Sequence, residues 1–195
     1  MKMTGSWHLY KAGQQWRKPQ GYARVVLEVA DWQAVCFSAP VVKLGPARSA
    51  GRKDLGPDLC RADIDFAEVV SRARRFAPGD TEIADVLLNQ RVAAGIGNVY
   101  KSEVLWSLRV SPFELLSELD DEVIEKLYRR ASKLLVANLT TVSRTTVPGG
   151  LAVYGRRGKP CRACGTPISK VAQGEHARVT TWCDRCQPRS VLTQN

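Results

Sequence analysis

Two closely spaced cysteine pairs near the end of the chain constrain its fold more than any other feature. They are Cys161-Arg-Ala-Cys164 and Cys183-Asp-Arg-Cys186, with 18 residues between them. A C-x₂-C turn directs two sulfurs at one point, and two such turns complete a tetrahedron of thiolates around Zn²⁺. Because four thiolates leave no open coordination position, the pattern predicts one structural zinc ion rather than a catalytic one.

Two other interpretations of these cysteines are weaker. A redox C-x-x-C motif is single and lies in a βαβ pattern, which this sequence does not show. A pair of disulfides is disfavoured in a chain whose N-terminus has no signal-peptide h-region and which has no run of about 18 apolar residues. Cys36, in a strand-like run, is predicted to be a small buried hydrophobe, and the role of Cys60 stays open.

The charge of the chain indicates its class of partner. There are 29 Lys and Arg against 19 Asp and Glu, which gives a net charge of +10 and a pI near 9.6. A protein this basic attracts polyanions, and nucleic acid is the most abundant one inside cells. The alternative is that the charge serves solubility alone. We expect a cytoplasmic, nucleoid-associated protein of bacterial type, a monomer that contacts no membrane.

Composition and periodicity divide the chain into four segments. Residues 1–45 are strand-like, 46–62 form a linker rich in Gly and Pro, 63–145 are helical, and 146–190 hold the cysteines. Helices are predicted over 63–76, 80–90 with Asp80 and Thr81 as caps, 98–108 and 120–139. Strands are predicted over 22–30 and 33–37, as a hairpin, and over 177–182.

A glycine-rich turn joins the second and third predicted helices. Gly95 and Gly97 permit a close approach of another backbone, and the N–H groups that begin the next helix form an anion site to which Asn98 adds a donor. The turn by itself also fits an ordinary helix hairpin with Asn98 as its N-cap, and the net charge of +10 together with the zinc hairpin favours phosphate binding. Arg178, on the cysteine hairpin, is placed either to hold a phosphate or to lie in solvent.

Two stretches carry a specific family resemblance. The segment 90–106, Gln-Arg-Val-Ala-Ala-Gly-Ile-Gly-Asn-Val-Tyr-Lys-Ser-Glu-Val-Leu-Trp, resembles the helix-two-turn-helix motif of the formamidopyrimidine-DNA glycosylase / endonuclease VIII family. The segments 153–168 and 178–187 are similar to the start and the end of that family's zinc finger. The beginning of the chain resembles the end of the family's N-terminal β-sandwich, in the endonuclease VIII-like branch.

The resemblance implies a fold, a function and a set of contacts. The implied fold class is α+β with several domains: part of a β-sandwich, a helix-two-turn-helix domain and a zinc-finger β-hairpin. The implied function is base-excision repair of duplex DNA that carries an oxidised base or an abasic site, as a DNA glycosylase and abasic-site (AP) lyase. The matching positions give DNA contacts at Gly97, Asn98, Tyr154, Arg178 and Met3, the last in the gap left by a flipped base, and zinc ligands at Cys161, Cys164, Cys183 and Cys186.

The start of the sequence departs from the family pattern. The family uses an N-terminal proline amine, followed by glutamate, as its nucleophile, whereas this sequence begins Met1-Lys2-Met3 and offers no catalytic residue of that kind. We therefore expect these residues to bind damaged DNA without glycosylase activity. Two hypotheses stay open: a glycosylase and lyase whose first segment is absent from this sequence, or a non-catalytic protein that binds damaged DNA. An unrelated zinc-ribbon protein is disfavoured, because both motifs occur together.

Overall fold

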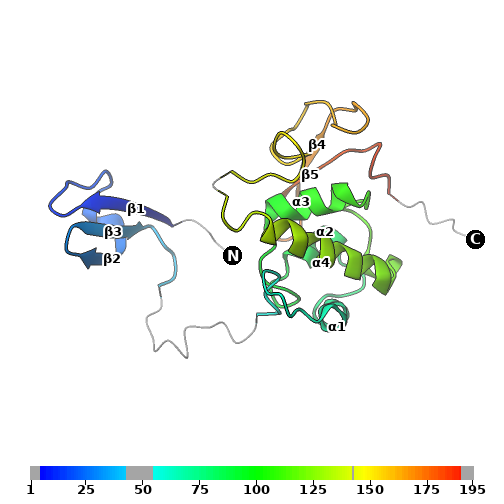
Figure 1. Ribbon diagram of the computed structural model, residues 1–195, viewed down its shortest axis with the longest axis horizontal. Coiled ribbons are helices and arrows are strands. Elements are labelled where there is room, and N and C mark those ends of the chain that lie inside the picture. The colour runs from blue at the N-terminus through cyan, green and yellow to red at the C-terminus, as the bar shows by residue number, and fades with distance from the viewer. Residues whose placement is uncertain (1–4, 43–54, 142, 190–195) are drawn as a thin grey trace, which may run out of the picture. The chain divides into compact units, whose positions relative to one another are not determined.

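The computed structural model describes residues 5–42, 55–141 and 143–189. The candidate contact Met3 lies outside them. The chain forms two compact units, Met1–Arg52 and Lys53–Asn195, and each is described by itself (Figure 1).

The first unit is a small antiparallel sheet. Its strands are β1 (Ser6–Lys11), β2 (Ala23–Val29) and β3 (Trp32–Phe37), in the order β1-β3-β2, with a 3₁₀ turn, η1 (Gln20–Tyr22), before β2. The hairpin predicted from the sequence is confirmed, since β2 pairs with β3. Valine, tryptophan and phenylalanine favour these strands because bulky and branched side chains pack well on a pleated surface.

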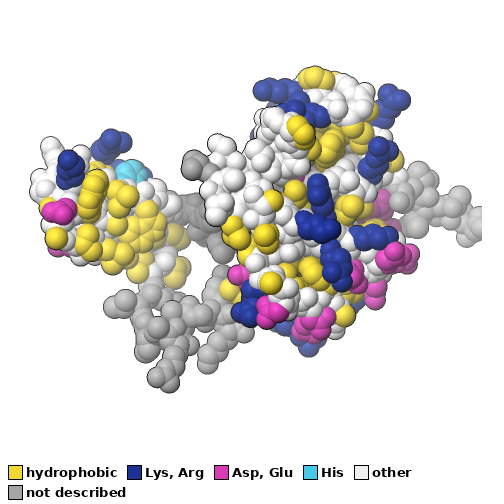
Figure 2. All heavy atoms as spheres, viewed as in Figure 1, with side chains coloured by type: hydrophobic (Ala, Val, Ile, Leu, Met, Phe, Trp, Pro, Cys, Tyr) yellow, Lys and Arg dark blue, Asp and Glu magenta, His cyan; other side chains and the backbone are white. Residues whose placement is uncertain are grey.

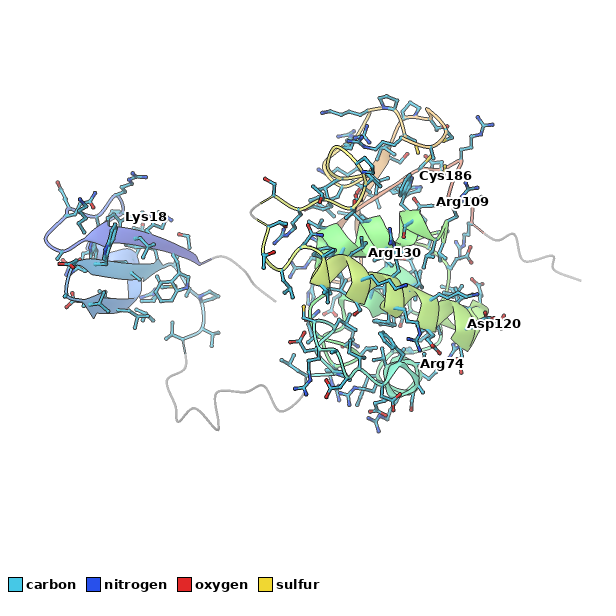
Figure 3. The ribbon with its side chains drawn as sticks, viewed as in Figure 1. Lys18, Arg74, Arg109, Asp120, Arg130 and Cys186 are labelled. Atoms are coloured by element: carbon cyan, nitrogen blue, oxygen red, sulfur yellow. The ribbon has the colours of Figure 1, made fainter. Side chains whose placement is uncertain are left out.

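One face of this sheet is covered by a loop, and the opposite face is exposed. One face buries Tyr10, Val35 and Phe37 beneath the 12–22 loop, where Trp16 packs edge-on against Phe37 and the Lys18 ammonium lies 5.7 Å from the Phe37 ring centre (Figure 3). Apolar side chains on the other face are exposed: Trp7, Leu9, Leu27, Val29 and Trp32. Cys36 is buried, as predicted.

The second unit begins with four helices around a common core. They are α1 (Phe66–Phe76), α2 (Ile83–Leu88), α3 (Asn98–Ser107) and α4 (Asp121–Val136), with a 3₁₀ turn, η2 (Leu116–Glu118), before α4. The four predicted helices are therefore confirmed. Their apolar stripes meet in a core that includes Leu87, Val104, Leu127 and Tyr128. In the described part of the chain, none of the helices combines the length and apolar character needed to span a membrane.

One helix start differs from prediction. The second helix begins at Ile83 rather than near Asp80 and Thr81, because the backbone there pairs with the 114–116 segment: Thr81 accepts from the Leu116 N–H at 2.9 Å. Helix α3 begins at Asn98, as predicted, and the alternative in which Asn98 is the N-cap is wrong because Gly97 occupies that position.

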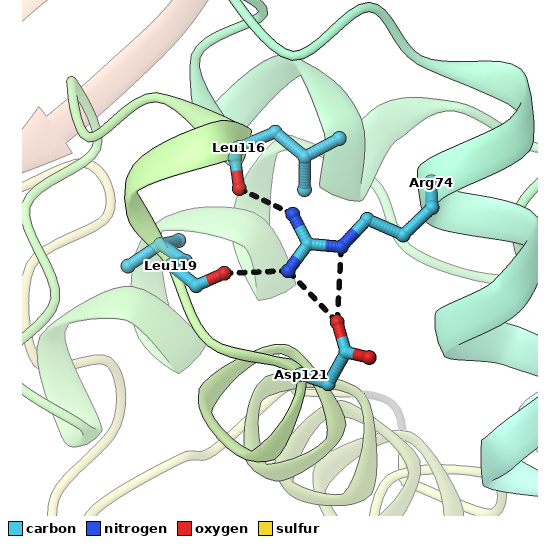
Figure 4. A network of polar contacts seen from close by, with 4 residues as sticks. All are labelled: Arg74, Leu116, Leu119 and Asp121. Carbon is cyan, nitrogen blue, oxygen red and sulfur yellow. Dashed lines mark hydrogen bonds and ion pairs between the residues drawn. The ribbon is translucent and has the colours of Figure 1, made fainter.

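Side-chain hydrogen bonds fix the ends of α1. Asp65, the N-cap, accepts from the backbone N–H groups of Ala67 and Glu68, which otherwise lack partners. At the other end, Arg74 donates to the carbonyls of Leu116 and Leu119, both at 2.6 Å, and pairs with Asp121 (Figure 4). Arg74 thus joins α1 to the segment that leads into α4.

The cysteine region follows as a two-stranded hairpin. Strands β4 (Ser169–Gln173) and β5 (Arg178–Trp182) pair antiparallel, with Gln173 opposite Arg178 and Ser169 opposite Trp182. The strand predicted over 177–182 is therefore confirmed. The hairpin packs on the helical core, where Phe113 meets the Trp182 ring edge-on at 4.9 Å between centroids.

Candidate nucleic-acid interface and zinc centre

The four cysteines predicted as zinc ligands come together in the structure. Their Sγ atoms all lie within 4.8 Å of one another, and the Cys161–Cys186 and Cys164–Cys183 sulfur pairs are 3.9 and 3.4 Å apart. A tetrahedral Zn²⁺ with bonds of about 2.3 Å requires sulfurs that are about 3.8 Å apart. The donor set therefore fits one tetrahedral zinc ion with no position left for a substrate. Cys186, one of the four, is labelled in Figure 3.

The surroundings of the sulfurs also fit a structural metal. Little apolar surface is available, since the local cluster is built on Val153, Ile168 and the cysteines themselves. The indole Nε1 of Trp106, near the end of α3, donates to Cys161 Sγ at 3.4 Å. A donor aimed at a thiolate stabilises its charge and orients it toward the metal. Helix α3 thus reaches the zinc centre directly.

The turn before α3 is built by one glutamine. The Gln90 side chain donates to the Ile96 carbonyl at 2.9 Å and accepts from the Gly95 N–H at 3.1 Å. Gly95 has φ +120°, a conformation that L-residues rarely adopt, and a Cβ there would lie 3.2 Å from Leu135 Cδ1. Gly97 is exposed and extended, with nothing within 4 Å of a Cβ placed on it. The turn therefore presents open backbone at the N-terminus of a helix, where anions bind.

Three consecutive residues of α3 turn polar side chains into the protein. Lys101, Ser102 and Glu103 are all buried. The Lys101 ammonium donates to Thr180 Oγ1 at 2.7 Å, and the Thr181 N–H donates to Ser102 Oγ at 3.3 Å. Burial lowers the pKa of Lys101 to about 8, partly offset by Asp85, because the interior disfavours an ammonium. These contacts fasten β5 to α3.

Glu103 organises the connector between α4 and the zinc hairpin. Its carboxylate accepts the backbone N–H groups of Ala152, Val153 and Tyr154 at 2.8, 2.9 and 2.8 Å, and the Thr146 hydroxyl. In the part of this connector that the structure describes, there is no helix or strand. A buried carboxylate that accepts several N–H groups is stabilised by these hydrogen bonds, and it thereby holds the loop.

The structure relates the candidate DNA contacts through α3. Asn98 starts this helix, Tyr154 is held by Glu103, and Arg178 starts the strand that Lys101 holds; all three candidates are half-buried. On the face shown in Figure 2, Lys and Arg side chains are spread over this unit from the zinc hairpin to the helices. Sequence reasoning missed the roles of Lys101 and Glu103. The signal that the sequence offered lies in α3. Its charged residues stand among apolar ones with no continuous polar face, which is typical of a helix that is buried on several sides.

Two family descriptions match the second unit. Residues 55–147 match "Formamidopyrimidine-DNA glycosylase H2TH domain", and residues 158–189 match "Zinc finger found in FPG and IleRS". Together with the clustered thiols, the second match assigns one structural zinc as the cofactor. The fold and the site thus define a protein with a helix-two-turn-helix domain followed by a zinc finger.

Individual relatives extend the match over nearly the whole chain. A probable endonuclease 8 2 of Streptomyces coelicolor is 39% identical over 96% of this chain and 70% of its own length. The DNA-(apurinic or apyrimidinic site) lyase Nei2 of Mycolicibacterium smegmatis is 35% identical over 97% and 74%. The crystal structure of Lactococcus lactis formamidopyrimidine-DNA glycosylase, bound to DNA containing an AP site, superposes with TM-score 0.73 at 24% identity, over 96% and 72%. The chain belongs to the formamidopyrimidine-DNA glycosylase / endonuclease VIII family, and its fold is that of the glycosylase.

Proposed function

We propose that this protein acts in base-excision repair by binding duplex DNA that carries an oxidised base or an abasic site. The observation that carries the proposal is the attachment of three separate candidate phosphate contacts to a single helix, α3. The Streptomyces relative is named an endonuclease and the Mycolicibacterium relative an AP-site lyase, and the Lactococcus protein holds AP-site DNA. The proposed activity class at the level of the family is therefore DNA glycosylase and AP lyase, and we expect residues 1–195 to contribute DNA binding to it.

Within this proposal each candidate contact has a role. The N–H groups at Gly97 and Asn98 receive one backbone phosphate, and the Arg178 guanidinium grips another through its planar fork. Tyr154 supplies a further phosphate contact from the connector. Met3 fills the gap left by the flipped nucleotide. We also propose the segment boundaries 1–45, 46–62, 63–145 and 146–190 for the sandwich part, the linker, the helix-two-turn-helix domain and the zinc finger.

The polypeptide of residues 1–195 tests this function directly. We expect it to bind an abasic-site duplex more tightly than an undamaged one, measured by fluorescence anisotropy. Affinity should fall with salt at a slope of about −0.9 per neutralised phosphate on a log–log plot. Equal affinity for both duplexes would contradict the proposed preference for damage.

Borohydride trapping then separates binding from chemistry. A lyase of this kind needs a neutral amine that can form an imine with the sugar. Among the described residues, Lys101 is a lysine whose pKa burial lowers to about 8, but its side chain is fully buried and cannot reach a sugar. We therefore expect no covalent complex on abasic DNA. A trapped complex would show that an amine within these residues performs the lyase step.

Substituting Gly97 by alanine tests the turn as a contact point. Alanine adopts the extended conformation of Gly97 freely and would meet no neighbouring atom. We expect an unchanged melting temperature, but a loss of about tenfold in DNA affinity, because the added methyl group would hold a phosphate away from the N–H groups and weaken about one hydrogen bond to a charged group. Gly95→Ala is the matched control: it strains the backbone and should lower the melting temperature. Full DNA affinity in Gly97→Ala would mean that DNA does not approach this backbone.

A further inference from the structure

A buried chain of hydrogen bonds links α3, both strands of the zinc hairpin and the start of α2. Lys101 Nζ donates to Thr180 Oγ1 at 2.7 Å, and the Thr180 hydroxyl donates to Gln173 Oε1 at 2.5 Å. Gln173 Nε2 then donates to Glu82 Oε2 at 2.7 Å and to the Pro112 carbonyl at 3.1 Å. Lys101 and Thr180 are fully buried and Gln173 is nearly so.

This chain of hydrogen bonds runs in a single direction. It runs from an ammonium, which only donates, through a hydroxyl and an amide to a carboxylate, which only accepts. Each link therefore orients the next, and successive bonds polarise one another. If β5 slipped by one residue along β4, Thr180 would turn to the opposite face of the hairpin. The bonds consequently exist in only one register.

The hydrogen-bond chain lies beside Arg178. Gln173 is the direct cross-strand partner of Arg178, and Thr180 follows Arg178 by two residues, so all three side chains belong to one face of the hairpin. Arg178 also acts electrostatically on Lys101. Two like charges repel, so the ammonium of Lys101, which is fixed in the interior, disfavours a guanidinium placed close to it. The same residues thus set the position of Arg178 and bias its orientation.

Holding the zinc hairpin on α3 does not by itself explain why polar residues are buried between them. Desolvation opposes a buried ammonium, and burial is the largest cause of the lowered Lys101 pKa. Apolar residues of similar size would hold a hairpin on a helix equally well, as replacements of buried ion pairs show. What an apolar contact lacks is the directionality of these hydrogen bonds, each of which requires one donor to face one acceptor.

We propose that Lys101, Thr180, Gln173 and Glu82 form a positioning chain that sets the register of the zinc hairpin on α3 and thereby aims Arg178 at the DNA backbone. The proposal rests on the DNA-binding function proposed above and assigns positioning residues to it. None of the four needs to touch DNA.

The test compares Thr180→Val, Thr180→Ser, Arg178→Ala and the double variant Thr180→Val/Arg178→Ala in the full chain. Valine keeps the shape of threonine but can neither accept from Lys101 nor donate to Gln173, whereas serine keeps the hydroxyl. We expect Thr180→Val to weaken binding to an abasic-site duplex about tenfold and Thr180→Ser to restore it. The double variant should bind no more weakly than Arg178→Ala alone. Zinc content and melting temperature, measured in parallel, should stay near those of the wild type.

The outcomes separate this inference from the proposed function. If the wild type fails to bind DNA, the function and the inference both fail. If the wild type binds but Arg178→Ala is silent, or if Thr180→Val weakens the double variant by its full factor again, the positioning chain is overturned while DNA binding stands. If Thr180→Val loses zinc, Lys101→Met replaces it. This variant removes the first link alone, and wild-type affinity in it would overturn the proposal.

Discussion

Replacing Cys183 by serine is expected to abolish zinc binding and to reduce DNA affinity about a hundredfold or more, since the zinc of such small modules supplies on the order of 10 kcal/mol to their folding. Cys183 is fully buried, and the cluster around it contains few other apolar residues. Without the metal, the fold of the hairpin has too little core to persist. Arg178 and the connector with Tyr154 would then lose their positions together.

Three measurements check this result: zinc per chain, helical circular dichroism and affinity for an abasic-site duplex. The helical signal should remain, because the helical core is separate from the apolar cluster at the sulfurs. Cys60→Ser is the matched control, since Cys60 is a partly buried thiol that packs against the helical core and is not among the four clustered sulfurs. Zinc retained by Cys183→Ser at the wild-type level would contradict the assignment.

Glu103→Gln is expected to lower the free energy of unfolding by about 3 kcal/mol, the typical cost of removing hydrogen bonds to a buried charged acceptor. The carboxylate of Glu103 accepts three backbone N–H groups and one hydroxyl. A glutamine of the same shape offers one acceptor oxygen and turns an NH₂ group toward N–H donors. The connector would loosen, and with it the position of Tyr154.

We therefore expect Glu103→Gln to weaken DNA binding as well as to lower the melting temperature, with zinc still bound. Glu125→Gln serves as the control: Glu125 forms an exposed ion pair with Arg129 on α4, and exposed pairs contribute at most about 1 kcal/mol. A melting temperature for Glu103→Gln as high as that of this control would show that the connector is held by other contacts.

Local patterns predicted the elements of this fold well. The C-x₂-C spacing identified four cysteines that do cluster, and apolar periodicity located four helices, the β2–β3 hairpin and strand β5. The helix start predicted at Asp80 and Thr81 is wrong, because the backbone at 81–82 pairs with a segment more than 30 residues away and so stays extended. No local signal shows that pairing, and a good capping residue is favourable only where the backbone is free to turn.

The sequence by itself determined the zinc ligands, the glycine turn before α3 and the family, because each depends on residue types at fixed short spacings. Only the tertiary structure decided the roles of Lys101 and Glu103. Their partners lie 79 residues away at Thr180 and up to 51 residues away at Tyr154, and what makes these contacts strong is burial. Charged side chains in a helix resemble solvated ones until the packing of other segments removes the water.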